Sequence, residues 1–129
     1  MIKFTVHGKP QGKGRPRVTS HGTYTPEKTK QYEELVRWCW RADSGKSICG
    51  VPLSVHITAY FMPPKSVSMK KHDELIGTPY THKPDADNIA KAILDALNGV
   101  AFVDDSAVAE LIVTKMYGER DCVEVRIEE

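Results

Sequence analysis

The fold class of this chain follows from one stretch, residues 51–61, with the sequence VPLSVHITAYF. Apolar side chains stand at every odd position from Val51 to Phe61, and polar or aromatic ones alternate with them from Ser54 onward. A period of two predicts a β-strand with one face on a hydrophobic core and the other open to solvent. The pair Pro63-Pro64 ends the strand. The sequence therefore predicts a sheet that is covered on one face.

Five further segments flank this strand. Residues 2–7 alternate in the same way and predict a second strand. Apolar residues at helical spacing predict amphipathic helices over residues 26–41 and 85–98. The stretches 107–117 and 121–127 alternate again with a short polar connection between them, which predicts a closing β-hairpin.

These elements follow one another in the order strand, loop, helix, strand, loop, helix, strand, strand. That order is typical of an α+β domain, and we expect a mixed or antiparallel sheet packed with two main helices. Residues 1–129 are expected to form a single domain, because a chain of this length has no room for two independent cores. The apolar fraction of 40% excludes a largely disordered chain.

The sequence lacks the marks of a membrane or disulfide-rich protein. No apolar run approaches the roughly 18 residues that a membrane span needs, and the N-terminal residues do not resemble a signal peptide. The three cysteines include no Cys-x-x-Cys pair, so neither a zinc site nor a disulfide framework is predicted. We therefore expect a cytoplasmic protein without a membrane partner.

The charges of the chain are unevenly distributed. Basic residues number 18 and acidic residues 17, so the formal net charge is +1. Residues 1–41, however, hold nine basic and three acidic side chains, whereas residues 42–129 hold nine basic and fourteen acidic ones. Such a division within one small domain indicates separate partners for the basic and the acidic parts.

The acidic part centres on residues 83–99, with the sequence KPDADNIAKAILDALNG. Asp87, Lys91 and Asp95 are spaced by four, so they line one face of the predicted helix. If the helical part spans residues 87–98, Asp85 lies just before it, where carboxylates often serve as caps. One interpretation is therefore structural, with a cap at the start of the helix and a solvated string of ion pairs along it.

A second acidic pair, Asp104 and Asp105, follows the helix. The tight turn at Asn98-Gly99 is expected to fold the chain back and to bring one of this pair within a few ångströms of Asp85 and Asp87. Like charges this close repel one another unless a cation lies between them. Carboxylate oxygens are ligands that Mg²⁺ and Mn²⁺ prefer. The sequence therefore predicts a divalent-metal site built from these aspartates.

A carboxylate-bound Mg²⁺ beside a lysine is suited to phosphoryl chemistry, because the metal lowers the pKa of a bound water and stabilises the leaving oxygen. Lys91 lies one turn from Asp87, where it is a candidate to neutralise charge on the reacting phosphate or to orient the attacking water. Its alternative role is to pair with Asp87 and Asp95.

The basic part centres on residues 8–17, with the sequence GKPQGKGRPR. Cations on a loop that contains prolines suit contacts with successive backbone phosphates of a nucleic acid. The alternative is a merely solubilising loop. A P-loop is excluded, because its Gly-x-x-x-x-Gly-Lys-Ser/Thr pattern is absent, and no nucleotide cofactor is expected. The candidate DNA contacts are Lys9, Lys13, Arg15, Arg17, Lys70, Lys71 and Lys83.

At this point the sequence resembles the RusA family of Holliday junction resolvases, which occur in prophages and phages. The resemblance is carried by GKPQGKGRPR at 8–17, YTP at 24–26, KPDADN at 83–88 with Lys91, LDALNG at 94–99 and DDSAV at 104–108. It covers most of the chain. The departure is Ala107, where the family often has a glutamine.

The resemblance implies a Mg²⁺-dependent, structure-selective endodeoxyribonuclease with a RusA-like domain, for which Mn²⁺ can substitute as the metal. In that family a homodimer nicks opposing strands of a four-way DNA junction during recombination and repair. The resemblance assigns metal binding and catalysis to Asp85, Asp87 and Asp105, and catalysis to Lys91, with Asp104 as a further metal candidate. It also implies the cytoplasm of a bacterial or phage-infected cell.

Two other functions compete with this interpretation. One is a non-catalytic nucleic-acid-binding accessory module, in which the acids serve only as caps and ion pairs. The other is an Asp-x-Asp phosphatase or glycosyl-transfer enzyme. The second is weakened because residues 81–84, THKP, do not form the apolar strand that usually precedes such aspartates.

Overall fold

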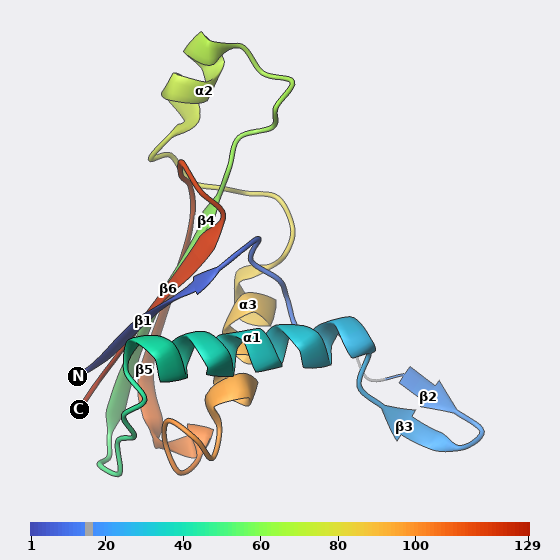
Figure 1. Cartoon of the computed structure of the whole chain (residues 1–129), viewed down its shortest axis with the longest axis vertical. Helices are drawn as coiled ribbons and strands as arrows, with labels where there is room; N and C mark the ends of the chain where they lie inside the picture. Colours follow the sequence, from blue (N-terminus) through green and yellow to red (C-terminus); the bar gives the residue numbers. More distant parts are fainter. Residues whose placement is uncertain (15–16) are drawn as a thin grey trace.

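The computed structural model of the chain describes residues 1–14 and 17–129 (Figure 1). Its centre is a four-stranded mixed sheet in the order β1-β6-β4-β5. The strands are β1 (Ile2–His7), β4 (Leu53–Phe61), β5 (Val108–Tyr117) and β6 (Cys122–Glu128). The predicted α+β fold with a mixed sheet is confirmed, and so are the strands expected over residues 2–7 and 51–61, within two residues.

The predicted hairpin of the last two strands is wrong. β4 lies between β5 and β6, pairing with β5 in parallel and with β6 antiparallel, while β6 also pairs antiparallel with β1. The chain passes over the end of β4 at Gly118, whose N–H donates to the Phe61 carbonyl at 2.9 Å. A Cβ at Gly118 would lie 2.9 Å from the Tyr60 ring, so this crossing needs a glycine.

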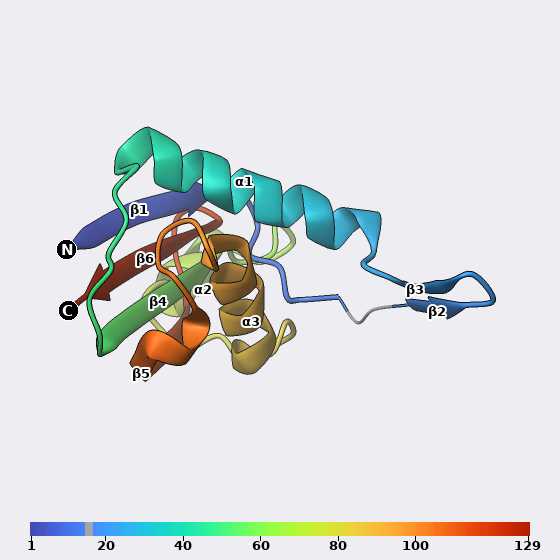
Figure 2. The ribbon, with the colours of Figure 1, turned by 90° about the horizontal axis from the view of Figure 1, so that it is seen from below.

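Two long helices cover one face of the sheet, as predicted (Figure 2). α1 (Glu27–Asp43) packs against β1 and α3, and α3 (Ala86–Leu97) packs against α1 and β5. The apolar face of α3 includes Ile89, Ile93 and Leu97, all fully buried. The other face of the sheet stays open: β4 alternates strictly between buried and half-buried residues.

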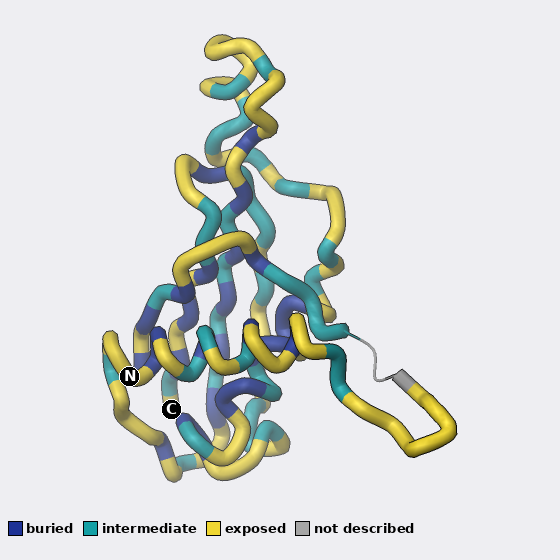
Figure 3. The backbone as a smooth tube through the Cα atoms, turned by 45° about the vertical axis from the view of Figure 1, so that its right-hand side comes forward, coloured by how far each residue is buried: buried dark blue, intermediate teal, exposed yellow. Residues whose placement is uncertain are grey.

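Two small elements lie outside the core, and both come from segments expected to be mainly loop (Figure 3). The 3-residue strands β2 (Arg17–Thr19) and β3 (Gly22–Tyr24) pair antiparallel. Helix α2 (Met69–Leu75) has no buried residue, and Ser68 caps it by accepting the N–H of Lys71 at 3.2 Å. Three-residue strands are too short for alternation to reveal them. No helix within residues 1–14 and 17–129 is long and apolar enough to cross a membrane.

Candidate functional site

The first two predicted metal ligands lie at the N-terminus of α3. Asp85 is the N-cap residue, and its backbone carbonyl accepts the N–H of Ile89 at 3.1 Å, but its carboxylate makes no capping hydrogen bond. Asp87 lies in the first turn, and both residues are exposed. In the described part of the chain neither carboxylate has a hydrogen-bond or ion-pair partner. The helix dipole favours negative charge here, and none of the described residues keeps either carboxylate from binding a cation.

Lys115, on strand β5 of the sheet, holds the segment that leads into α3 in place. Its Nζ donates to the carbonyls of His82 and Pro84, at 2.8 Å each, and lies 5.6 Å from the centre of the Tyr80 ring. Hydrogen bonds from a charged donor are stronger than neutral ones. Lys115 therefore fixes the backbone immediately before Asp85. Sequence reasoning missed this residue, because its two partners lie 33 and 31 residues earlier in the chain.

The basic loop docks on the first turn of α3. The N–H of Lys13 donates to the carbonyl of Asn88 at 2.9 Å. A Cβ at Gly12 would lie 3.0 Å from Cβ of Asn88 and 3.1 Å from Cβ of Pro84, so the two backbones approach closely only because a glycine is present. The loop that was predicted to contact DNA thus lies directly beside the residues that were predicted to bind metal.

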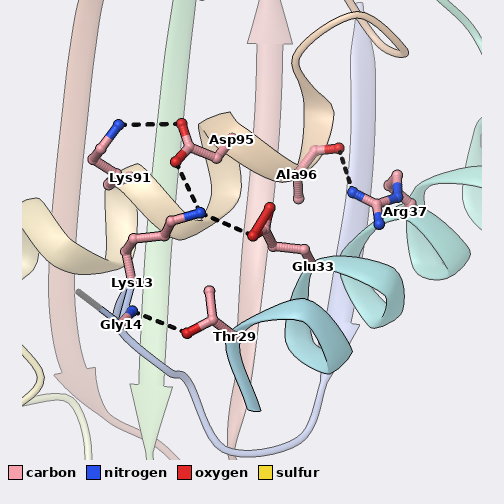
Figure 4. A network of polar contacts seen from close by, with 8 residues as sticks. All are labelled: Lys13, Gly14, Thr29, Glu33, Arg37, Lys91, Asp95 and Ala96. Atoms are coloured by element: carbon pink, nitrogen blue, oxygen red, sulfur yellow. Dashed lines mark hydrogen bonds and ion pairs between the residues drawn. The ribbon is translucent and has the colours of Figure 1, made fainter. Parts of the chain in front are cut away.

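The side chain of Lys13 ties this loop to both helices (Figure 4). Its Nζ lies 2.9 Å from Oε1 of Glu33 on α1 and 3.1 Å from Oδ2 of Asp95 on α3, and 18% of the side chain is exposed. Burial lowers the pKa of Lys13, but the hydrogen bonds to Glu33 and Asp95 outweigh it, so the pKa is raised overall. The ammonium group is therefore engaged by two carboxylates in this structure.

The predicted string of ion pairs along α3 is only partly present. Lys91 Nζ lies 3.3 Å from Oδ1 of Asp95, and the lysine side chain is 62% exposed. No pair between Lys91 and Asp87 occurs among the described residues. An exposed pair four residues apart on a helix contributes little to stability, so Lys91 can leave Asp95 for another anion at small cost.

The second acidic pair lies at the other end of α3. The backbone N–H of Asp105 donates to Oδ1 of Asn98, the C-cap residue, at 3.1 Å. Asp105 begins a 3-10 turn, η1 (Asp105–Ala107), that leads into β5. Oδ2 of Asp104 accepts the Ser106 hydroxyl at 2.5 Å, and this bond, with further help from backbone N–H groups, lowers the pKa of Asp104.

The expectation that one chain brings these aspartates within a few ångströms of one another is wrong. Asp87 and Asn98 are eleven residues apart on one helix, about 16 Å at 1.5 Å per residue. The chain after Asn98 does not run back along α3, because residues 99–102 form a compact turn in which the N–H of Gly99 donates to the Phe102 carbonyl at 2.9 Å. Within residues 1–14 and 17–129, no group of three His, Cys, Asp or Glu side chains is placed to hold a metal ion.

The carboxylates nevertheless fit Mg²⁺ chemically, since all are hard oxygen donors. They form two separate half-sets, Asp85 with Asp87 and Asp104 with Asp105, at opposite ends of α3. Neither half-set supplies all the predicted ligands of the metal site. A complete site at either end of α3 needs further carboxylates from elsewhere.

The remaining predicted residues are spread over the surface. Lys9, Lys70, Lys71 and Lys83 are exposed, two of them on the projecting helix α2. Arg15 lies outside the described residues, as does the side chain of Arg17, so the predictions made for these two arginines stay predictions.

Comparison with known proteins identifies the family of the chain. Residues 7–128 match the family model described as Endodeoxyribonuclease RusA. The chain is also 37% identical over 137 residues to the "Uncharacterized protein YqaN" of Bacillus subtilis (strain 168), an alignment that covers 99% of this chain and 96% of that protein. The chain therefore belongs to the RusA endodeoxyribonuclease family.

Proposed function

We propose that the chain is a Mg²⁺-dependent endodeoxyribonuclease that resolves four-way DNA junctions by paired nicks in opposing strands. The observation that carries the proposal is the pair of exposed carboxylates, Asp85 and Asp87, which have no partner among the described residues and lie beside a docked basic loop in a chain of the RusA family. Free carboxylates suit a metal and the loop suits a phosphate backbone. No observation favours the phosphatase or glycosyl-transfer alternative.

In this proposal Asp85, Asp87 and Asp105 bind the metal, and Asp104 lies next to the third ligand. Bound Mg²⁺ supplies a water of lowered pKa and stabilises charge on the leaving oxygen, and Mn²⁺ is expected to replace it. Lys91 lies one turn from Asp87 on an exposed face of α3. From there its ammonium group neutralises charge that develops on the reacting phosphate.

The separation of Asp87 from Asp105 supports a site that is assembled from two chains. We infer that in a homodimer the N-terminus of α3 of one protomer faces η1 of its partner, so that each site takes two carboxylates from one chain and Asp105 from the other. Two-fold symmetry then creates two identical sites. Two sites match two opposing cuts, so that resolution depends on dimerisation.

The test of the proposed activity compares the parent protein with Asp87→Asn on a four-way DNA junction, with and without Mg²⁺. We expect the parent to nick the junction symmetrically in Mg²⁺ only. The variant should bind the junction but cut it at least about 100-fold more slowly. The matched control is Asp73→Asn on the exposed helix α2, which should cut like the parent. A parent that binds junctions but never cuts them in Mg²⁺ or Mn²⁺ identifies the accessory module instead.

A further inference from the structure

Lys91 has a carboxylate one helical turn away on each side. Asp87 lies four residues before it and Asp95 four residues after it, so both are within reach of its ammonium group on one face of α3. Asp87 is a predicted metal ligand, whereas Asp95 takes no part in the proposed reaction. The partner that Lys91 takes therefore decides whether this metal ligand is paired or open.

The structure places Lys91 at Asp95 (Figure 4). Nζ of Lys91 lies 3.3 Å from Oδ1 of Asp95, and in the described part of the chain it makes no contact with Asp87. An isolated helix favours the opposite choice, because an acid that precedes its lysine by four residues makes the better pair. Contacts outside α3 therefore favour Asp95.

Lys13 supplies this preference, because it fixes the Asp95 carboxylate. Its Nζ lies 3.1 Å from Oδ2 of Asp95 and 2.9 Å from Oε1 of Glu33. Glu33 shares the charge of Lys13, so the Asp95 carboxylate still attracts a second cation. The Asp95 side chain is only 21% exposed, and a side chain that is already held loses little entropy when it gains another partner. Asp87 is exposed and has no such anchor among the described residues.

An ammonium group on Asp87 would compete with a metal ion. A divalent cation needs an open carboxylate oxygen, and it repels a lysine that lies on the same oxygen. With Lys91 on Asp95, the Asp87 carboxylate stays open. An ammonium group has three N–H donors, and the contact with Asp95 uses one of them. Lys91 thus keeps donors for a phosphate beside the metal.

We propose that Asp95 is a positioning residue that holds Lys91 away from Asp87 and so keeps this metal ligand open. The proposal rests on the proposed function, because it concerns the metal and the lysine of that site. Asp95 itself contacts neither the metal nor the DNA and acts only through Lys91. Without its carboxylate, Lys91 turns to the other acid within reach, Asp87.

The test measures metal binding without cleavage. Mn²⁺ is titrated into each purified protein in the absence of DNA, and the free ion is measured by electron paramagnetic resonance. We expect Asp95→Asn to bind Mn²⁺ about two-fold more weakly than the parent, which is the competition expected from one exposed pair on a helix. Asp95→Ser removes the same charge with a smaller side chain and should show the same loss.

Two variants keep the contact and serve as controls. Asp95→Glu retains the negative charge, so it should bind Mn²⁺ as the parent does. Glu33→Gln removes the other partner of Lys13 but leaves Lys91 on Asp95, and it should also bind like the parent. A loss in Glu33→Gln equal to that in Asp95→Asn overturns the proposal, because the effect is then one of the Lys13 ion pairs.

A double-mutant cycle separates the positioning role from a general loss of negative charge. In the Lys91→Met background no ammonium group is left to reach Asp87, so the further change Asp95→Asn should not alter Mn²⁺ binding. A loss that persists in this background overturns the proposal. Parent-like Mn²⁺ binding by the single variant Asp95→Asn overturns it as well.

The proposed function stands or falls by a different observation. A parent that cuts junctions while Asp95→Asn binds Mn²⁺ normally contradicts the positioning role alone. A protein that shows the predicted cycle but never cuts a junction contradicts the proposed function alone. A parent that binds no Mn²⁺ contradicts both, because Asp87 is then no metal ligand.

Discussion

Asp105 donates its backbone N–H to the side-chain oxygen of Asn98 at 3.1 Å. This bond attaches the start of η1 to the C-cap of α3 and so holds the second acidic pair a full helix length away from Asp87. One chain therefore carries two incomplete sets of carboxylates. The amide of Asn98 is therefore one of the groups that position Asp105, beside the backbone bond in which the Asp105 carbonyl accepts the Val108 N–H.

Replacing Asn98 by alanine removes this bond and leaves Asp105 without its anchor. We expect the free energy of unfolding to fall by about 1 kcal/mol, the usual net value of such a hydrogen bond. Junction cleavage should fall much more than junction binding, since a misplaced ligand affects the metal rather than the phosphate contacts. Urea unfolding and cleavage assays measure the two effects. Gln31→Ala, on the exposed side of α1, is the control, and equal cleavage by both variants would show that the anchor is unimportant.

Lys13 is predicted to stabilise the fold through its two carboxylate partners. Lys13→Met leaves Glu33 and Asp95 without their shared cation, and we expect a loss of about 2 kcal/mol in urea unfolding. The matched control is Lys30→Met on the exposed surface of α1, which should change stability by less than about 0.5 kcal/mol. Equal losses in the two variants would contradict an anchoring role.

The pH dependence of this effect has a definite sign. The folded-state pKa of Lys13 lies above its ordinary value of 10.5, so its stabilising contribution is fully present below the unfolded pKa and is lost as the pH rises through the folded pKa. The stability difference between the parent and Lys13→Met should therefore stay constant from neutral pH up to about 10 and shrink at higher pH. A difference that shrinks already near neutral pH would point to another titrating group.

Lys115 is predicted to position the segment before α3. Lys115→Met removes two hydrogen bonds of 2.8 Å to the carbonyls of His82 and Pro84. We expect faster hydrogen exchange of the amides of residues 81–87 and slower cleavage, with junction binding nearly unchanged. Lys46→Met, remote from this segment, should leave both exchange and cleavage as in the parent. Unchanged exchange in Lys115→Met would show that the segment is held by other contacts.

The basic loop is predicted to contact DNA phosphates. The double variant Arg15→Ala, Arg17→Ala should bind a four-way junction more weakly. The slope of log affinity against log salt should become shallower by roughly one for each phosphate contact that is lost. Lys28→Ala, Lys30→Ala on α1 removes the same charge from a neighbouring surface. If both double variants show the same change in slope, the effect is one of net charge and not of specific contacts.

The sequence predicts the elements of this fold better than it predicts their pairing. The alternation in residues 51–61 and the apolar spacing around Ile89 and Ile93 arise because each element buries one face, and the structure follows both patterns. The hairpin prediction was wrong for a different reason. A short connection normally joins paired strands, and no local pattern reveals that Gly118 crosses the end of β4 instead.

For the candidate site too, the sequence predicts which residues take part better than it predicts where they lie. The acidic residues are recognisable from their number and chemistry, and so is the basic loop. The distances between these residues cannot be predicted from the sequence. The turn after Asn98 is held by backbone hydrogen bonds of residues 99–102, and no side-chain pattern specifies these bonds. The ion pairs of Lys13 and the carbonyl contacts of Lys115 join segments far apart in the chain. Only the folded structure brings these partners together.

Complementation between inactive variants tests the two-chain site most directly. Asp87→Asn and Asp105→Asn are each purified, mixed, unfolded and refolded together, and the mixture is assayed on a four-way junction in Mg²⁺. A mixed dimer has one site with both aspartates intact only if each site takes Asp87 from one chain and Asp105 from the other. We predict that each variant alone is inactive, that the mixture nicks one strand, and that a mixture of Asp85→Asn with Asp87→Asn stays inactive. A mixture of Asp87→Asn and Asp105→Asn that remains inactive beside an active, identically refolded parent would contradict a site shared between two chains.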